Sequence, residues 1–200
     1  LALNRELGNN QGIAHSLNNL GFVAHHQGDY AAARSFHEES LALRQQLGDQ
    51  RAIAFAQTGL GWAMHKLGDY DGAATLLAEA RLLFKQLGDK QLLAYSSNIL
   101  AGVVHDQGND QEATALLDES VNTCRDIGAK YSLAVGLRLL GDVTHEQGEH
   151  QRAAALMNES LKTFREIGDR YGVAFALCSL ANITHDQGDD ERATMLLKES

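Results

Sequence analysis

The chain has 200 residues, an apolar fraction of 44%, no proline and a net charge of −9. No apolar run approaches the roughly 20 residues that a membrane-spanning helix needs, so no transmembrane segment is predicted. Residues 1–100 carry 8 Lys/Arg against 9 Asp/Glu, whereas residues 101–200 carry 9 against 17. This acidic balance argues against nucleic acid and anionic membranes as direct ligands, and it favours a protein partner with a basic segment.

Glycine recurs at every twentieth residue, and this spacing organises the whole chain. The positions are Gly8, Gly28, Gly48, Gly68, Gly88, Gly108, Gly128, Gly148, Gly168 and Gly188. Glycine just after a helix can adopt the left-handed conformation that closes the helix end. The Asp, Asn or Glu that usually follows can cap the next helix. The lattice therefore predicts ten helix ends, grouped into helix pairs with a period of 40 residues.

The first complete unit covers residues 14–53 and contains two predicted helices. Apolar and small residues at helical spacing define a first helix that ends at Gln27-Gly28, and a second helix runs from Tyr30 to about Leu47. The partial unit 1–13 precedes it, and the later units are 54–93, 94–133, 134–173 and 174–200.

Small and large residues alternate at fixed places in these units. One alanine column lies in the first helices, another lies in the second helices, and Leu20 and its equivalents supply a large residue beside a third small position. The two alanine columns are Ala14, Ala54, Ala94, Ala134 and Ala174, and Ala33, Ala73, Ala113, Ala153 and Ala193. Such alternation predicts antiparallel helices that interlock at short separation.

The repeat resembles the tetratricopeptide repeat family in three short motifs. Leu20-Gly21, Gly28-Asp29-Tyr30 and Ala33 match its pattern, and all three recur 40 residues later. The period is longer than the usual 34 residues, and it is similar to the repeats of bacterial multidomain regulators, signalling ATPases and kinesin light chain. The resemblance implies an all-α, right-handed solenoid of five helix–turn–helix repeats, in one superhelical domain over residues 1–200, that binds protein partners without catalysis or cofactor.

In proteins of this resemblance, the first helix of each repeat lines a concave groove that holds a peptide or a partner helix. Carrying the groove positions over to this chain gives His15, Asn18, Phe22, His25, Phe55, Thr58, Trp62, His65, Lys66, Tyr95, Asn98, Asp106, Arg138, Asp142, Glu146, Asn182 and Asp186.

Two aromatic residues are the strongest candidates for contacts with a partner. Phe22 and Trp62 occupy a position that is Gly, Asp or Asn in the other repeats, so packing does not demand an aromatic there. Exposed aromatics with polar surroundings are typical binding anchors. The alternative is that they fill a gap between neighbouring helices. Acidic residues of the later repeats, among them Asp142 and Glu146, would receive basic residues of the partner.

One histidine recurs in every repeat, at His25, His65, His105, His145 and His185. Repeats stack about 10 Å apart, too far for these rings to share a metal ion, so no metal site is predicted. Each ring lies in the last turn of its helix, and we expect it to cap exposed carbonyls or to donate to the residue four positions on. Hydrogen bonding to a ligand in the groove is the alternative. Cys124 and Cys178 show no metal spacing and read as reduced thiols.

The remaining alternatives concern the ends of the chain and its larger context. The sequence starts and stops at the same phase of the repeat without polar caps, which predicts a segment of a longer array or head-to-tail association of copies. A cytoplasmic interaction module is the first interpretation. The second is a sensor or autoinhibitory array of a larger bacterial signalling ATPase or transcription regulator.

Overall fold

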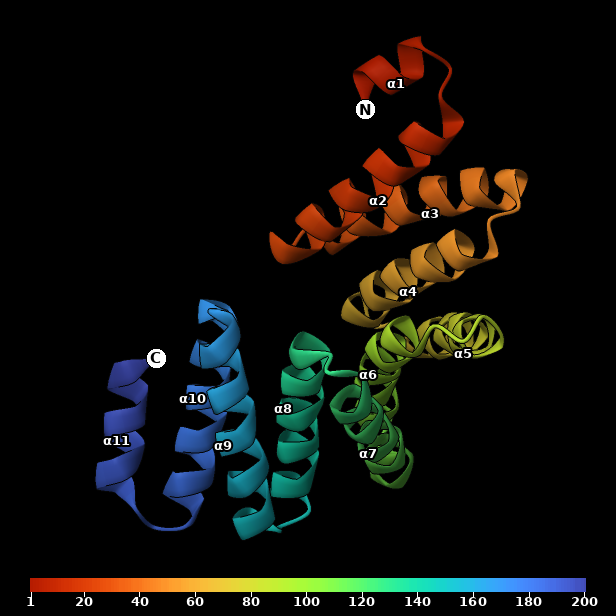
Figure 1. Cartoon of the computed structure of the whole chain (residues 1–200). Coiled ribbons are helices and arrows are strands. Elements are labelled where there is room, and N and C mark those ends of the chain that lie inside the picture. Colours follow the sequence, from red (N-terminus) through yellow and green to blue (C-terminus); the bar gives the residue numbers. More distant parts are fainter. The chain divides into compact units, whose positions relative to one another are not determined.

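The computed structural model describes all 200 residues, as eleven helices joined by short turns and without a strand (Figure 1). This confirms the all-α prediction. The residues group into two compact units, unit 1 at residues 1–107 and unit 2 at residues 108–200.

Unit 1 begins with a five-residue helix and continues with two helix pairs and one further helix. Its helices are α1 (Ala2–Glu6), α2 (Asn10–His26), α3 (Tyr30–Leu47), α4 (Gln50–Lys66), α5 (Tyr70–Gln86) and α6 (Lys90–Asp106). Unit 2 has the helices α7 (Asp110–Ile127), α8 (Lys130–Glu146), α9 (His150–Ile167), α10 (Arg170–Asp186) and α11 (Asp190–Glu199).

The turns form as the glycine spacing predicts. All ten lattice glycines have positive φ, from 61° at Gly8 to 85° at Gly188. The residue after the glycine caps the next helix wherever it is Asp or Asn, because its side-chain oxygen accepts a backbone N–H of the first turn. Ala129 and Glu149 stand at this position without a capping hydrogen bond.

The first helix of each pair, here called an A helix, and the second, a B helix, lie in different layers of each unit. In unit 1 the A helices α2, α4 and α6 contact one another in sequence, whereas the B helices α3 and α5 do not. In unit 2 the A helices α8 and α10 are likewise in contact, and no pair of B helices is. The A helices therefore form the more crowded layer, and their outward side is called the A face below.

Alanine and leucine fill the space between the layers. Both alanine columns are buried except at the partly exposed Ala174. Leu60, Leu100, Leu140 and Leu180 are buried as predicted, but Leu20 is 36% exposed. The short α1 accounts for this difference, because its Asn4 contacts the beginning of α2 at Gly12 and Ser16 and nothing covers Leu20 further along.

Candidate functional site

Three aromatic residues and one histidine gather on α2 and α4 in unit 1. The ring centroid of Phe22 lies 5.4 Å from that of Phe55 and 6.4 Å from that of Trp62. The His25 ring is stacked on Trp62 with 3.2 Å between centroids. Aromatic pairs at such separations attract each other beyond the area they bury. Phe22, Phe55, Trp62 and His25 are called the aromatic cluster below.

The aromatic cluster is packed on one side and open on the other. Phe22, Phe55 and Trp62 are each partly exposed, while His26 and Lys66 beside them are exposed. Burial, reinforced by neighbouring positive charge, lowers the pKa of His25 from 6.5 to about 3, so its ring is neutral near pH 7. The open side therefore offers apolar ring surface with a polar and cationic rim.

Three predicted groove residues lie inside the fold, which corrects the expectation that they face a partner. Asn18, Thr58 and Asn98 are at most 1% exposed. The Thr58 hydroxyl donates to the carbonyl of Ala54, and the Asn18 amide oxygen is bonded to a ring nitrogen of His37. An A helix is covered by its own B helix and by neighbouring A helices, so its outward stripe is narrower than the family pattern suggests.

His37, which the sequence interpretation missed, is fully buried behind the aromatic cluster. Its Nδ1 lies 3.2 Å from Asn18 Oδ1, and its Nε2 has no hydrogen-bond partner. A Cβ added at Gly21 would lie 2.5 Å from Nε2, and one at Gly59 would lie 2.6 Å from Nδ1. The equivalent residues are Leu77, Leu117, Met157 and Leu197. The signal was therefore a break in an apolar column, matched by a glycine at position 59.

The recurring histidines bond across repeats rather than within them. His65 Nε2 lies 2.6 Å from Asp106 Oδ2, and His145 Nε2 lies 2.7 Å from Asp186 Oδ2, in each case 41 residues further on. The expected acceptors four residues downstream are thus wrong for these rings, because they serve as backbone caps or turn residues. Burial lowers the pKa of His65 even though the Asp106 carboxylate opposes the shift.

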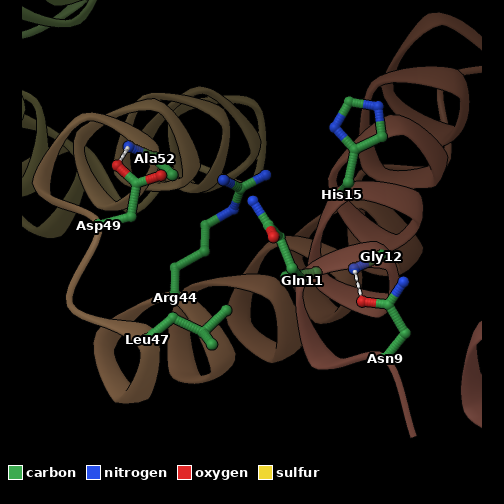
Figure 2. A pocket seen from close by; sticks show the side chains of 9 residues that line it. Asn9, Gln11, Gly12, His15, Arg44, Leu47, Asp49 and Ala52 are labelled. Atoms are coloured by element: carbon green, nitrogen blue, oxygen red, sulfur yellow. Dashed lines mark hydrogen bonds between the residues drawn. The ribbon is translucent and has the colours of Figure 1, made fainter.

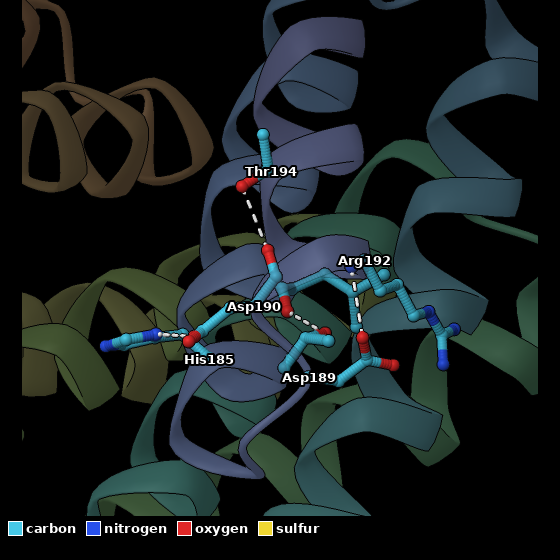
Figure 3. Close-up of polar contacts among 7 residues, drawn as sticks. His185, Asp189, Asp190, Arg192 and Thr194 are labelled. Carbon is cyan, nitrogen blue, oxygen red and sulfur yellow. Dashed lines mark hydrogen bonds and ion pairs between the residues drawn. The ribbon is translucent and has the colours of Figure 1, made fainter.

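The last histidine of this column makes a different contact. His185 Nδ1 lies 2.5 Å from Asp190 Oδ1, five residues on, while Asp189 accepts the backbone N–H of Arg192 (Figure 3). Thr194 donates its hydroxyl to the carbonyl of Asp190 in the same turn. The cluster therefore joins α10 to α11, a structural role.

In unit 2 the predicted acidic residues are already partnered. Arg138 Nη1 donates to Asp142 Oδ2 at 2.7 Å, and its guanidinium lies 5.9 Å from the ring centroid of Phe175. Burial raises the pKa of Asp142, and the Arg138 charge opposes that shift. The expectation that Asp142 receives a basic residue of a partner is corrected, because Arg138 supplies that cation internally.

The other predicted residues differ in how accessible they are. His15, Lys66, Asp106, Glu146, Asn182 and Asp186 are exposed, and Tyr95 is partly exposed. His25 and His65 are buried, with 6% and 8% of their surface exposed, so they support the A face rather than project from it.

No group of three or more His, Cys, Asp or Glu side chains is placed to hold a metal ion. Both cysteines are free, Cys124 buried and Cys178 exposed. None of the eleven helices combines the length and apolarity that crossing a bilayer requires.

Comparison with known families gives one match. A family model described as tetratricopeptide repeat matches residues 12–86, 90–166 and 132–200. A comparison with curated protein sequences finds no match.

Several solved structures share the fold at low sequence identity. BtubC (BKLC) from P. vanneervenii is 16% identical with a TM-score of 0.73, and the match covers 100% of this chain and 89% of that chain. The TPR-like repeats of a putative kinesin light chain from Podosopora anserina are 18% identical with a TM-score of 0.69, covering 92% and 91%. A Rap protein complexed with competence and sporulation factor is 14% identical with a TM-score of 0.84, covering 92% of this chain and 51% of that chain. The present chain thus spans about half the length of the Rap protein.

Proposed function

Because the chain belongs to the tetratricopeptide repeat family, we propose that it is a non-catalytic interaction module that binds a polypeptide segment on the A face of unit 1. The observation that carries this proposal is the aromatic cluster, whose three aromatic rings are partly exposed on adjacent A helices.

The chemistry of the aromatic cluster suits a protein ligand. Binding energy concentrates in Trp, Tyr and Arg residues surrounded by contacts that exclude water. Trp62 is held by stacking on the neutral His25, so little side-chain freedom is lost when a partner covers it. Phe22 and Phe55 extend the same surface by about one ring each, which suits an apolar side chain of an extended or helical segment.

A basic stretch in the partner is a further part of the proposal. Asp106 and Asp186 keep close to half of their side-chain surface exposed while each accepts from a histidine of the preceding repeat. Each carboxylate can accept several hydrogen bonds, so a Lys or Arg of the partner can still bind its outer oxygen. The net negative charge of residues 101–200 would speed the encounter with such a segment.

A second candidate function is that of a sensor or autoinhibitory array within a larger bacterial regulator. The supporting observation is that this chain aligns with about half of a Rap protein whose structure contains competence and sporulation factor. In either role we place the chain in the cytoplasm, where its two free thiols stay reduced.

Head-to-tail self-association is also proposed, on separate evidence. Tyr171, Phe175 and Leu197 of α10 and α11 are 83%, 63% and 54% exposed. Covering them with a second copy would bury apolar surface, and light scattering over a concentration series tests this. A molecular mass that stays at that of the 21.7 kDa chain would contradict it.

The main proposal is tested with a peptide selected from a random display library on the purified chain. Calorimetry then compares the wild type with Phe22→Ala and with the control Phe36→Ala, which removes a partly buried ring from the B helix α3. We expect Phe22→Ala to weaken binding by about 2 kcal/mol and the control to leave affinity unchanged at temperatures where both are folded. Equal affinities for both variants would contradict the proposal.

A further inference from the structure

A pocket of about 500 Å³ opens in unit 1 where α3 ends and where α2 and α4 begin. Figure 2 shows the Arg44 side chain rising into it from α3, with Gln11 and His15 of α2 on one side and Asp49 on the other. The backbone of α2 and α4 lies close because Gly12 and Ala52 carry almost no side chain there.

The pocket exists because Arg44 breaks a core column of the repeat. The equivalent residues are Phe84, Cys124 and Phe164, which are 0%, 0% and 2% exposed. Phe84 packs with Ala54, Leu92 and Leu93 and fills the corresponding space in the next repeat. Position 44 thus holds a charged residue that is only partly buried, and Ala52 stands where Leu92 would help to fill the gap.

The stem of Arg44 is fixed while the end of its side chain is left without a partner. Nε donates to Ser40 Oγ at 3.1 Å, and the Ser40 hydroxyl donates to the Ala14 carbonyl at 2.8 Å. No acceptor of the protein lies within hydrogen-bond distance of either terminal nitrogen. Burial lowers the pKa of Arg44, against the opposing charge of Asp49, which is the mark of a guanidinium that has lost water without gaining a full counter-charge.

The neighbouring groups define which anion fits. Asp49 Oδ1 accepts the N–H of Ala52 at 3.1 Å, and no ion pair joins Asp49 to Arg44. His15 Nε2 lies 3.2 Å from the side-chain nitrogen of Asn19, so the neutral ring carries its proton on Nδ1 and can donate. One cation beside one carboxylate suits a single negative charge, whereas a doubly charged phosphate would meet repulsion from Asp49.

We propose that this pocket binds a carboxylate group, with the two terminal nitrogens of Arg44 as its anchor and with Gln11 and His15 as further donors. Planar guanidinium and carboxylate groups pair through two parallel hydrogen bonds, which single-point cations do not offer. The positive ends of α2 and α4, both of which begin at the pocket, favour the same charge.

The position of the pocket identifies the source of the carboxylate. His15 and Phe22 are seven residues apart on α2, which puts them on one side of the helix about 10 Å apart. A polypeptide that covers the aromatic cluster can therefore place an Asp or Glu side chain, or its own C-terminus, over Arg44. In this respect the inference rests on the proposed function, whereas carboxylate binding by the pocket does not.

Titration with sodium acetate tests the pocket without any peptide. Backbone ¹⁵N–¹H spectra are recorded against sodium chloride of equal ionic strength, and sodium phosphate serves as the competing anion. We expect saturable shifts at Gln11, His15 and Ala52 with acetate, and an acetate affinity at least about tenfold weaker in Arg44→Gln. Arg34→Gln is the control, because Arg34 is exposed and paired with Glu38 on the same helix.

Arg44→Phe is the second variant and should restore the core column seen at Phe84. It should abolish the acetate shifts and raise the melting temperature, since the ring fills space that now holds a hydrated cation. Acetate shifts that persist in both Arg44 variants, or phosphate binding that is stronger than acetate binding, would overturn the proposal. Loss of acetate binding would leave the peptide experiment of the preceding section unaffected.

The source of the carboxylate is then separated with the selected peptide. Versions with a glutamate side chain and an amidated C-terminus are compared with versions that have glutamine and a free C-terminus. The version that loses affinity in Arg44→Gln carries the carboxylate that the pocket binds. If Arg44→Gln binds both versions as tightly as the wild type, the assignment to the partner polypeptide is contradicted.

Discussion

A histidine at position 37 replaces the leucine or methionine that fills the core in the next three repeats. It is 0% exposed, and its Nε2 lacks a partner. An unpaired buried polar group costs free energy that an apolar side chain of similar size does not. Gly21 and Gly59 provide the room for its ring, so three residues of unit 1 are adapted to one another.

The pH dependence of stability follows from this burial. Desolvation lowers the pKa of His37 from 6.5 to about 4 and contributes most to lowering that of His25 to about 3. Between these values and pH 6.5 the unfolded chain binds more protons than the folded one, so stability is fully present above pH 6.5 and is lost as the pH falls. Each of the two histidines should contribute a loss of about 2 kcal/mol between pH 7 and pH 5.

His37→Leu should therefore make unit 1 more stable and less sensitive to acid. Urea unfolding at pH 7 and pH 5 measures both effects, and the stability gain should be larger by about 2 kcal/mol at pH 5. His26→Leu, at an exposed position on α2, is the control. A His37→Leu variant that loses as much stability on acidification as the wild type would show that His37 is not kept neutral by the fold.

At the scale of the helix, interior glycines differ in what surrounds them. A Cβ at Gly59 would meet the ring of His37, whereas a Cβ at Gly102 would lie 3.6 Å from the nearest atom, His65 Cε1. Gly59→Ala should therefore destabilise unit 1 by about 1–3 kcal/mol. Gly102→Ala should stabilise it by about 0.5–1 kcal/mol, because alanine is the better helix former. Thermal unfolding of the pair measures the contrast, and equal effects would contradict the packing described at Gly59.

Helix capping supplies a second test at this scale. Ala129 is the N-cap of α8 and makes no side-chain hydrogen bond, while Asp89 and Asp169 at equivalent positions do. Ala129→Asp should stabilise unit 2 by about 1 kcal/mol. Ala129→Asn separates the cap from the added charge, because it provides the same acceptor without ionising. If neither variant shifts the urea midpoint, the missing cap is not a weakness of α8.

For the whole molecule, repeats are held only by their neighbours, so stability should fall toward the helices with the fewest buried residues. Helix α1 buries no residue and α11 buries only Ala193, whereas α4 and α8 bury ten and eight. Amide hydrogen exchange should be fastest in α1 and α11 and slowest in α4 and α8. Uniform protection along the chain would show that the chain unfolds as one cooperative body instead.

The fold was largely predictable because its determinants are local and repeated. Glycine at every twentieth position and a following Asp or Asn define each turn by backbone geometry alone, and these turns form as predicted. Which side chains remain open was less predictable, because that depends on distant neighbours. Asn18 was assigned to the groove from the family pattern, yet His37, 19 residues further on, draws it into the interior.

The functional features that sequence analysis missed are breaks in the repeat on the B helices. Arg44 in place of phenylalanine or cysteine, and His37 in place of leucine, are visible in the sequence as exceptions to apolar columns. Their consequences, a pocket and a buried ring, required the spacing of α2, α3 and α4. The histidine column misled for a related reason, because its carboxylate partners lie 41 residues away and not four.

The most direct test of the central claim uses the only tryptophan in the chain. A single indole N–H signal in the ¹⁵N–¹H spectrum reports on Trp62 while the selected peptide is added. We predict that this signal shifts saturably, with the dissociation constant that calorimetry gives for the same peptide. An indole signal that stays in place when calorimetry shows the chain to be saturated would contradict binding at the aromatic cluster.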